Sequence, residues 1–75
     1  MRVSLDNLEI GEMGEIYEIR TERQEIYRKL MNLGFLPGNE VKVLQRSPVY
    51  LIETGFTQLA LDKETCHLIR VVLKK

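Results

Sequence analysis

The hydrophobic pattern of this chain changes its period most sharply across residues 33–38, a stretch rich in glycine and proline. Before this stretch, apolar side chains recur every three or four positions, which predicts a single α-helix over roughly residues 22–33. After it, apolar and polar side chains alternate, as is typical of strands that bury one face. The chain is therefore expected to contain one long helix, with sheet making up most of the remainder.

Local signals mark both ends of the predicted helix. Thr21 and Gln24 fit a capping box that would begin it. Glu25 precedes Lys29 at a spacing that favours an ion pair on the helix surface. Gly34 stands where a left-handed residue would end the helix, a conformation that glycine adopts freely.

Five short strands are expected around this helix. They cover residues 15–19, where imperfect alternation suggests a bulge, residues 41–46, the two halves of a hairpin at 49–61, and residues 69–73. Helical turns are expected at residues 4–8 and 62–65, with Asp62 as the cap of the second. Five strands and one helix in so short a chain suggest a small barrel, which removes most exposed sheet edges.

The composition limits what such a domain can be. Its 75 residues leave room for one core, and the single cysteine excludes a framework of internal disulfides. Eleven basic and eleven acidic side chains balance to zero net charge, which argues against nucleic-acid binding, since phosphates call for a basic surplus. The N-terminus lacks the apolar core of a signal peptide, and no apolar run could span a bilayer, so a cytoplasmic protein is expected.

The stretch Leu33–Gly38, LGFLPG, has two interpretations. As a joint between helix and strand, it would fold Phe35 back onto Leu30, and Leu36 to Asn39 would form a type II turn. As a contact surface, it would hold an apolar side chain out toward a partner, because so short a loop cannot easily bury two large side chains. The residues alone leave both interpretations open.

The run RKLMNLGFLPGNEVKVL, from Arg28 to Leu44, resembles the signature of the FeoA family, small proteins of bacterial and archaeal ferrous iron uptake. The opening LDNLEIGEMGEI and the closing LALDKETCHLIRV also resemble that family, so the resemblance covers nearly the whole chain. It implies a single domain over residues 1–75, mainly β with one α-helix, folded as a small SH3-like five-stranded barrel. It also implies a non-catalytic accessory protein that binds the cytoplasmic part of FeoB, a GTPase-linked ferrous iron permease.

With the family in view, LGFLPG becomes the candidate partner-binding surface. Its six residues are Leu33, Gly34, Phe35, Leu36, Pro37 and Gly38. If the stretch is a contact surface, Phe35 is expected to be structural and Leu36 to project outward. The tyrosines that are available to line a shallow groove are Tyr17, Tyr27 and Tyr50. The protein would be peripheral at the inner membrane through FeoB, with no direct insertion, and a homodimer remains open.

Few residues are candidates for catalysis or metal binding. Cys66 and His67 are adjacent, so their side chains diverge and cannot readily form a thiolate–imidazole pair. Together with Asp62 and Glu64 they offer metal-ligand types, but Asp62 is expected to cap a turn and Glu64 to face solvent. No catalytic residue, metal site or cofactor is therefore expected.

Two other functions stay open. Domains similar to the FeoA family occur at the C-terminus of iron- and manganese-dependent repressors, which implies a possible metal-responsive regulatory domain that binds iron or manganese directly. A small RNA-binding barrel would need a basic face with exposed aromatic side chains. A metal titration and the salt dependence of binding separate these alternatives.

Overall fold

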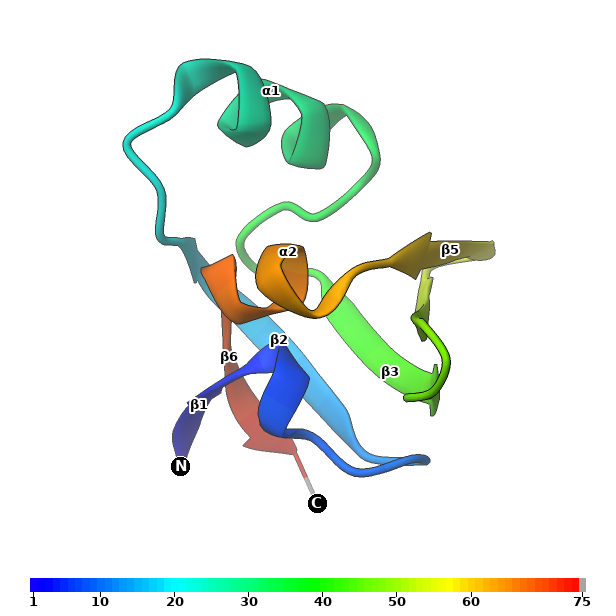
Figure 1. Ribbon diagram of the computed structural model, residues 1–75. Helices are drawn as coiled ribbons and strands as arrows, with labels where there is room; N and C mark the ends of the chain where they lie inside the picture. Colours follow the sequence, from blue (N-terminus) through cyan, green and yellow to red (C-terminus); the bar gives the residue numbers. More distant parts are fainter. Residues whose placement is uncertain (75) are drawn as a thin grey trace.

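The computed structural model describes residues 1–74, which form one antiparallel sheet with two helices and a turn of 3-10 helix (Figure 1). The sheet order is β1-β6-β2-β3-β4-β5. The strands are β1 (Arg2–Ser4), β2 (Met13–Ile19), β3 (Glu40–Gln45), β4 (Tyr50–Thr54), β5 (Thr57–Leu61) and β6 (Ile69–Lys74). The helices are the 3-10 turn η1 (Leu5–Asn7), α1 (Gln24–Asn32) and α2 (Lys63–Leu68). Within residues 1–74, no helix is long and apolar enough to cross a membrane.

All five predicted strands are present, but the prediction of a five-stranded barrel is wrong in two respects. A sixth strand, β1, pairs with β6 in the register Arg2↔Val72. The sheet ends at β1 and β5, which do not pair with each other, so the barrel is not closed. Three residues are too few to display an alternating period, and closure depends on the distance between two strands. A local sequence pattern therefore predicts neither the short strand β1 nor whether the barrel closes.

The bulge expected in the first predicted strand is confirmed in β2. Its register against β6 shifts between Ile16 and Glu18. The extra residue re-aims the strand, so Ile16 and Ile19 both reach the core although they lie three positions apart. The predicted hairpin is also confirmed, since β4 and β5 pair along their whole length without a register shift.

The start of the predicted helix is corrected. Helix α1 begins at Gln24, and its N-cap is Arg23, which makes no side-chain capping bond. The Thr21 hydroxyl instead accepts a hydrogen bond from the Arg23 N–H at 3.2 Å, so the threonine closes a local turn before the helix. Glu25 pairs with Arg23 at 2.7 Å rather than with Lys29. The predicted capping box is absent because the chain becomes helical about two residues later than the pattern suggests.

The predicted end of the helix is confirmed. Gly34 has a φ of 103°, in the left-handed region. Its N–H donates to the Met31 carbonyl at 3.1 Å, and the Phe35 N–H donates to the Leu30 carbonyl at 3.0 Å. This pair of bonds is the Schellman motif, and it turns Phe35 back under the helix.

We expect Gly34→Val to lower the free energy of unfolding by about 1–2 kcal/mol, because a side chain with a β-carbon is strained in the left-handed conformation. Space is not the obstacle, since the nearest atom to an added Cβ is the Thr54 methyl at 3.8 Å. Urea denaturation measures the change, with Gly34→Ala as a smaller probe of the same strain. An unchanged midpoint for both variants would contradict a left-handed cap.

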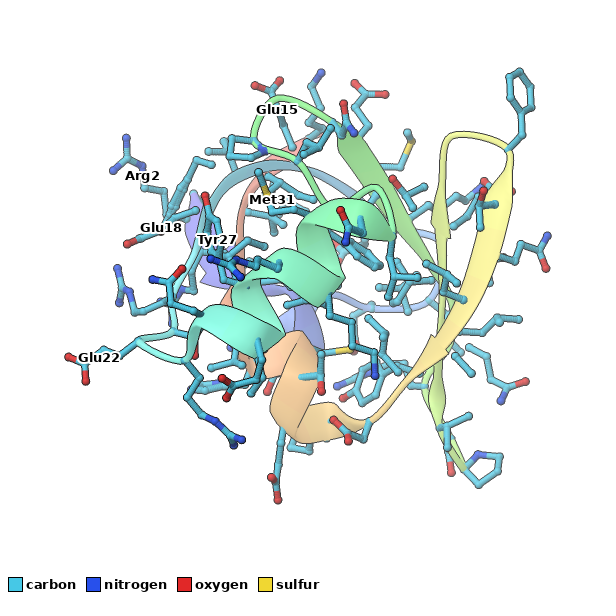
Figure 2. The ribbon with its side chains drawn as sticks, turned by 90° about the horizontal axis from the view of Figure 1, so that it is seen from above. Arg2, Glu15, Glu18, Glu22, Tyr27 and Met31 are labelled. Atoms are coloured by element: carbon cyan, nitrogen blue, oxygen red, sulfur yellow. The ribbon has the colours of Figure 1, made fainter. Side chains whose placement is uncertain are left out.

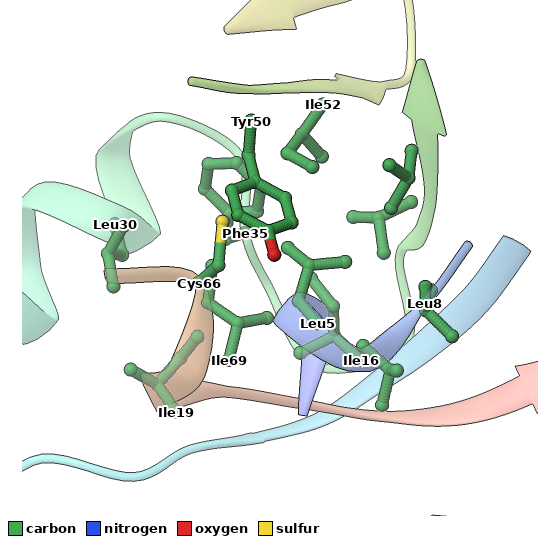
Figure 3. Packing of buried hydrophobic residues seen from close by; sticks show 13 residues of the cluster. Leu5, Leu8, Ile16, Ile19, Leu30, Phe35, Tyr50, Ile52, Cys66 and Ile69 are labelled. Carbon is green, nitrogen blue, oxygen red and sulfur yellow. The ribbon is translucent and has the colours of Figure 1, made fainter. Parts of the chain in front are cut away.

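The core lies between the concave face of the sheet, η1 and the helices (Figure 3). Its fully buried side chains come from nearly every element, and Phe35 is among the largest of them. Cys66 of α2 is also completely buried, as expected for a free cysteine that packs as a small apolar residue. In Figure 3, Phe35, Tyr50 and Cys66 lie together beneath β4.

Candidate functional site: a loop and cleft for protein contact

Hydrogen bonds hold the stretch LGFLPG in one conformation. The Asn39 N–H donates to the Leu36 carbonyl at 3.0 Å, and Gly38 has a φ of 95°, as the predicted type II turn requires. The Gly38 N–H donates to the Ile16 carbonyl at 2.7 Å, and the Ile16 N–H donates to the Asn39 carbonyl at 2.9 Å. These last two bonds tie the turn to β2, so the loop has little freedom left to lose when a partner binds.

Side chains also fix the start of the loop. The Gly34 carbonyl accepts a hydrogen bond from the Asn39 amide at 2.8 Å and a longer one from the Thr54 hydroxyl at 3.5 Å. The first bond closes the loop upon itself, and the second reaches across to β4. The loop therefore has a defined position relative to the β4–β5 hairpin.

The two large side chains of the loop differ in how deeply they are buried. Phe35 is 0% exposed, whereas Leu36 is 40% exposed. Leu33 is half-buried and packs against the core, while Pro37 and Gly38 are exposed. The structure thus removes Phe35 from direct contact with a partner and leaves Leu36 as the large apolar side chain that the loop presents.

A cleft of about 550 Å³ lies between this loop and the β4–β5 hairpin. Leu33, Gly34 and Gly38 line it on the loop side. Figure 2 shows the hairpin standing beside the C-terminal half of α1. The side chains lining the cleft elsewhere include apolar Met13, Val41 and Phe56 and charged Glu40, Lys42 and Glu53. Three of the six predicted site residues therefore border one cleft, and Leu36 and Pro37 lie on the adjoining surface.

Phe56 on the hairpin side of this cleft was not predicted from the sequence. It is fully exposed at the tip of the hairpin. The connection between paired Thr54 and Thr57 is only Gly55-Phe56, and Gly55 has a φ of 61° while Phe56 does not have a positive φ. This is a type II′ turn, which matches the twist of a hairpin. The sequence did contain a signal for Phe56, because an aromatic residue directly follows the glycine of the predicted hairpin.

The three tyrosines do not line one groove, so that expectation is wrong. Tyr50 is in the core, and its hydroxyl donates to the Asp6 carbonyl at 3.1 Å. Tyr17 lies under the Arg2 guanidinium, 4.7 Å from its carbon to the ring centroid. Tyr27 is exposed on α1, on the side of the molecule where Arg2 and Glu18 lie in Figure 2.

A second cluster surrounds the carboxylate of Asp6, which is buried in η1. The Ser4 hydroxyl donates to it, His67 Nδ1 lies 3.3 Å away, and Lys63 Nζ lies 3.7 Å away. Burial raises the pKa of Asp6. The hydrogen bonds from Ser4 and His67 and the nearby charges of His67 and Lys63 outweigh this effect, and the pKa lies below its ordinary value. The cluster joins η1 to α2 and was not foreseen from the sequence.

The predicted cap of α2 is confirmed, since the Asp62 carboxylate accepts a hydrogen bond from the Thr65 N–H at 2.7 Å. Cys66 is completely buried, and burial raises the pKa of its thiol to about 12. It is therefore protonated at neutral pH and unsuited to act as a nucleophile or metal ligand. Within residues 1–74, no three His, Cys, Asp or Glu side chains are arranged to hold a metal ion.

We expect the protein to bind no ferrous iron with micromolar affinity, because the described part of the chain offers no convergent set of ligands. Anaerobic calorimetric titration at neutral pH measures this. Saturable micromolar binding that disappears in His67→Ala or Cys66→Ser would contradict the prediction, and it would identify the chain as a direct metal binder.

Comparison with known proteins places this geometry in a family. The profile of the FeoA domain matches residues 3–73. The crystal structure of an iron uptake regulatory protein, FeoA, superposes with a TM-score of 0.90 at 24% identity, covering 99% of each chain. Stenotrophomonas maltophilia FeoA complexed with zinc, described as an SH3 domain protein, gives a TM-score of 0.79 at 27% identity, with 96% of this chain and 89% of that chain covered. No match was found among curated protein sequences.

The fold also occurs inside larger proteins. T. acidophilum IdeR superposes with a TM-score of 0.88 at 18% identity, where 97% of this chain matches 34% of the IdeR chain. Similarity at this level concerns the fold alone. The profile match, by contrast, runs from β1 into β6 and includes the loop and both sides of the cleft. This chain belongs to the FeoA family, small SH3-like domains associated with ferrous iron transport.

Proposed function

We propose that this chain is a non-catalytic accessory protein of ferrous iron uptake, which binds the cytoplasmic part of a FeoB-like transporter through the LGFLPG loop. Membership of the FeoA family supports the connection with iron transport. The observation that carries the choice of surface is the contrast between Phe35, which is fully buried, and Leu36, which is 40% exposed on the same hydrogen-bonded loop.

A leucine in this position is suited to binding a partner for two physical reasons. The turn behind it is fixed by backbone bonds, so little conformational entropy is lost on association. The adjoining cleft combines apolar side chains such as Met13 with charged ones such as Lys42 and Glu53. Protein–protein interfaces usually combine apolar and polar side chains in this way.

The proposal also implies a cellular location for the protein. It would be cytoplasmic and would reach the inner membrane only through the transporter. Catalysis is not part of the proposal, because the one cysteine is buried and protonated and the LGFLPG loop carries no titratable side chain.

We expect Leu36→Glu to weaken association with the cytoplasmic part of FeoB at least tenfold, or about 1.4 kcal/mol, since a carboxylate would replace the exposed apolar contact. The melting temperature should stay nearly unchanged, because the side chain is not part of the core. Isothermal titration calorimetry and thermal denaturation measure both quantities on the same preparation.

Val49 provides a matched control for this experiment. It is an aliphatic residue 43% exposed just before β4, at the opposite end of that strand from the hairpin tip. Val49→Glu adds the same charge outside the loop and should leave binding within a factor of two or so, as for a surface change away from an interface. Equal weakening by both variants would point to charge repulsion in general, and normal binding by Leu36→Glu would remove the loop from the interface.

A metal-responsive regulatory role is the second candidate, and the structural similarity to IdeR and to a manganese-dependent transcriptional repressor favours it. In each case this chain matches less than half of the longer protein, and the identity is below 20%. The iron titration described above separates the two proposals, because the regulatory role requires direct metal binding and the accessory role does not.

A further inference from the structure

The two ends of the open sheet are protected very differently. Natural proteins guard edge strands by making them short, by placing charges or proline on them, or by adding bulges. Edge strand β1 is three residues long and carries Arg2. Edge strand β5, Thr-Gln-Leu-Ala-Leu, has five residues without a charge or a proline, and it pairs with β4 without a register shift. Strand β5 therefore lacks the protection that charge, proline or a bulge would give it against pairing with another strand, and α1 borders it at Ala60 and Leu61 across a groove.

The hairpin geometry identifies the backbone groups that remain free on β5. Thr54 and Thr57 flank the two-residue turn and form a hydrogen-bonded pair, so alternate residues of β5 bond to β4. The residues between them, Gln58 and Ala60, direct their N–H and C=O groups away from β4. Both residues are exposed, and within residues 1–74 no further strand pairs with this edge.

The free N–H and C=O groups of β5 can form hydrogen bonds with the same groups of a second copy. In an antiparallel pairing centred on Leu59, Gln58 of one copy faces Ala60 of the other, and the reciprocal pair forms at the same time. The two Leu59 side chains meet in the non-hydrogen-bonded position, where cross-strand side chains lie closest. No like charges are placed opposite each other, because the strand has none. We propose that β5 is a dimerisation edge, at which a second copy of this chain adds its own β5 to form a continuous two-fold sheet.

The same register accounts for the exposed aromatic residue at the hairpin tip. It sets Phe56 of one copy opposite Asp62 of the other. Asp62 borders a groove of about 200 Å³ between α1 and the end of β5. Its apolar lining residues are Ile26, Leu30, Leu33, Ala60 and Leu61, and its polar ones are Lys29, Asp62 and Thr65. Phe56, which is fully exposed in its own chain, is thus brought to a partly apolar groove of the second copy. Strand addition of this length buries a small area, so the dimer forms reversibly and at high protein concentration.

The test measures molar mass by sedimentation equilibrium from micromolar to millimolar protein. We expect dimer in the upper part of this range for the wild type. Ala60→Pro removes one outward N–H without removing a bond to β4, so this variant should remain monomeric across the whole range with an unchanged circular dichroism spectrum. Ala60→Ser keeps the N–H and should dimerise like the wild type. Leu36→Glu, on the loop, should also dimerise normally, so this proposal and the proposed function fail independently.

Two further measurements keep the outcome decisive if Ala60→Pro does not fold. Gln58→Pro removes a different outward N–H and should abolish the dimer in the same way. In the wild type, amide hydrogen exchange at Gln58 and Ala60 should slow as the concentration rises, while exchange at exposed amides elsewhere stays constant. A wild type that is monomeric throughout, a dimer that survives either proline, or exchange independent of concentration would overturn the proposal.

Discussion

Phe35→Ala should lower the free energy of unfolding by about 3–5 kcal/mol, the usual cost of emptying a buried aromatic site. The side chain is 0% exposed and is among the largest in the core. It packs near Tyr50 and Cys66, beneath β4 and beside α2 (Figure 3). Small domains have only about 5–15 kcal/mol of stability in total, so this variant should be close to its unfolding threshold at room temperature.

Urea denaturation of Phe35→Ala and Leu36→Ala tests this prediction with neighbouring residues of the same loop. Leu36→Ala should change the stability by no more than about 0.5 kcal/mol, as is common for surface substitutions. The ratio of the two effects is the informative quantity. Similar losses for both variants would mean that the loop buries the two side chains alike, contrary to their exposed fractions of 0% and 40%.

The burial of Phe35 was predictable because it follows from local backbone chemistry, whereas the exposure of Leu36 was expected only if the stretch is a contact surface. Gly34 favours the left-handed end of the helix, and the residue after it must then turn back toward Leu30. The next residue begins the turn at Pro37-Gly38 and is carried away from the core. The hairpin at residues 49–61 was predictable for a similar reason, since alternation and a turn glycine act over a few residues.

The features that sequence reasoning missed depend on residues far apart in the chain. Strand β1 forms because Arg2 pairs with Val72 of β6, and a local sequence pattern cannot predict a pairing between such distant residues. The cleft arises where the loop approaches a hairpin some twenty residues further on, which places Gly34 near Thr54. Tyr50 looked like a surface aromatic by type, yet its place on the buried face of β4 puts it in the core.

The Asp6 cluster is the clearest example of such long-range organisation. The carboxylate accepts from Ser4 and lies beside two side chains of α2, His67 and Lys63. The backbone carbonyl of the same residue accepts from the Arg46 guanidinium and the Tyr50 hydroxyl, each at 3.1 Å. One residue of a single helical turn thus joins the N-terminal segment, the β3–β4 connection and α2, three parts of the chain that the sequence pattern treats separately.

Asp6→Ala should lower the free energy of unfolding at pH 7 by about 1.5–3 kcal/mol, the range expected for hydrogen bonds to a charged group. The loss should depend on pH in a defined direction. Because the pKa of Asp6 is lowered on folding, its ionised form stabilises the protein above the unfolded pKa of about 4, and this stabilisation disappears as the pH falls through the lower folded value. The difference between wild type and variant should therefore be largest near neutrality and shrink below about pH 4.

Chemical denaturation between pH 7 and the acid limit of folding measures this difference. Glu64→Ala is the matched control, since Glu64 is an exposed acid on the same helix as His67 and Lys63. Removing it should change the stability little at any pH. If the cost of Asp6→Ala were the same at pH 3 as at pH 7, ionisation of the carboxyl group would add nothing to the stability of the fold. That result would contradict the lowered pKa of Asp6.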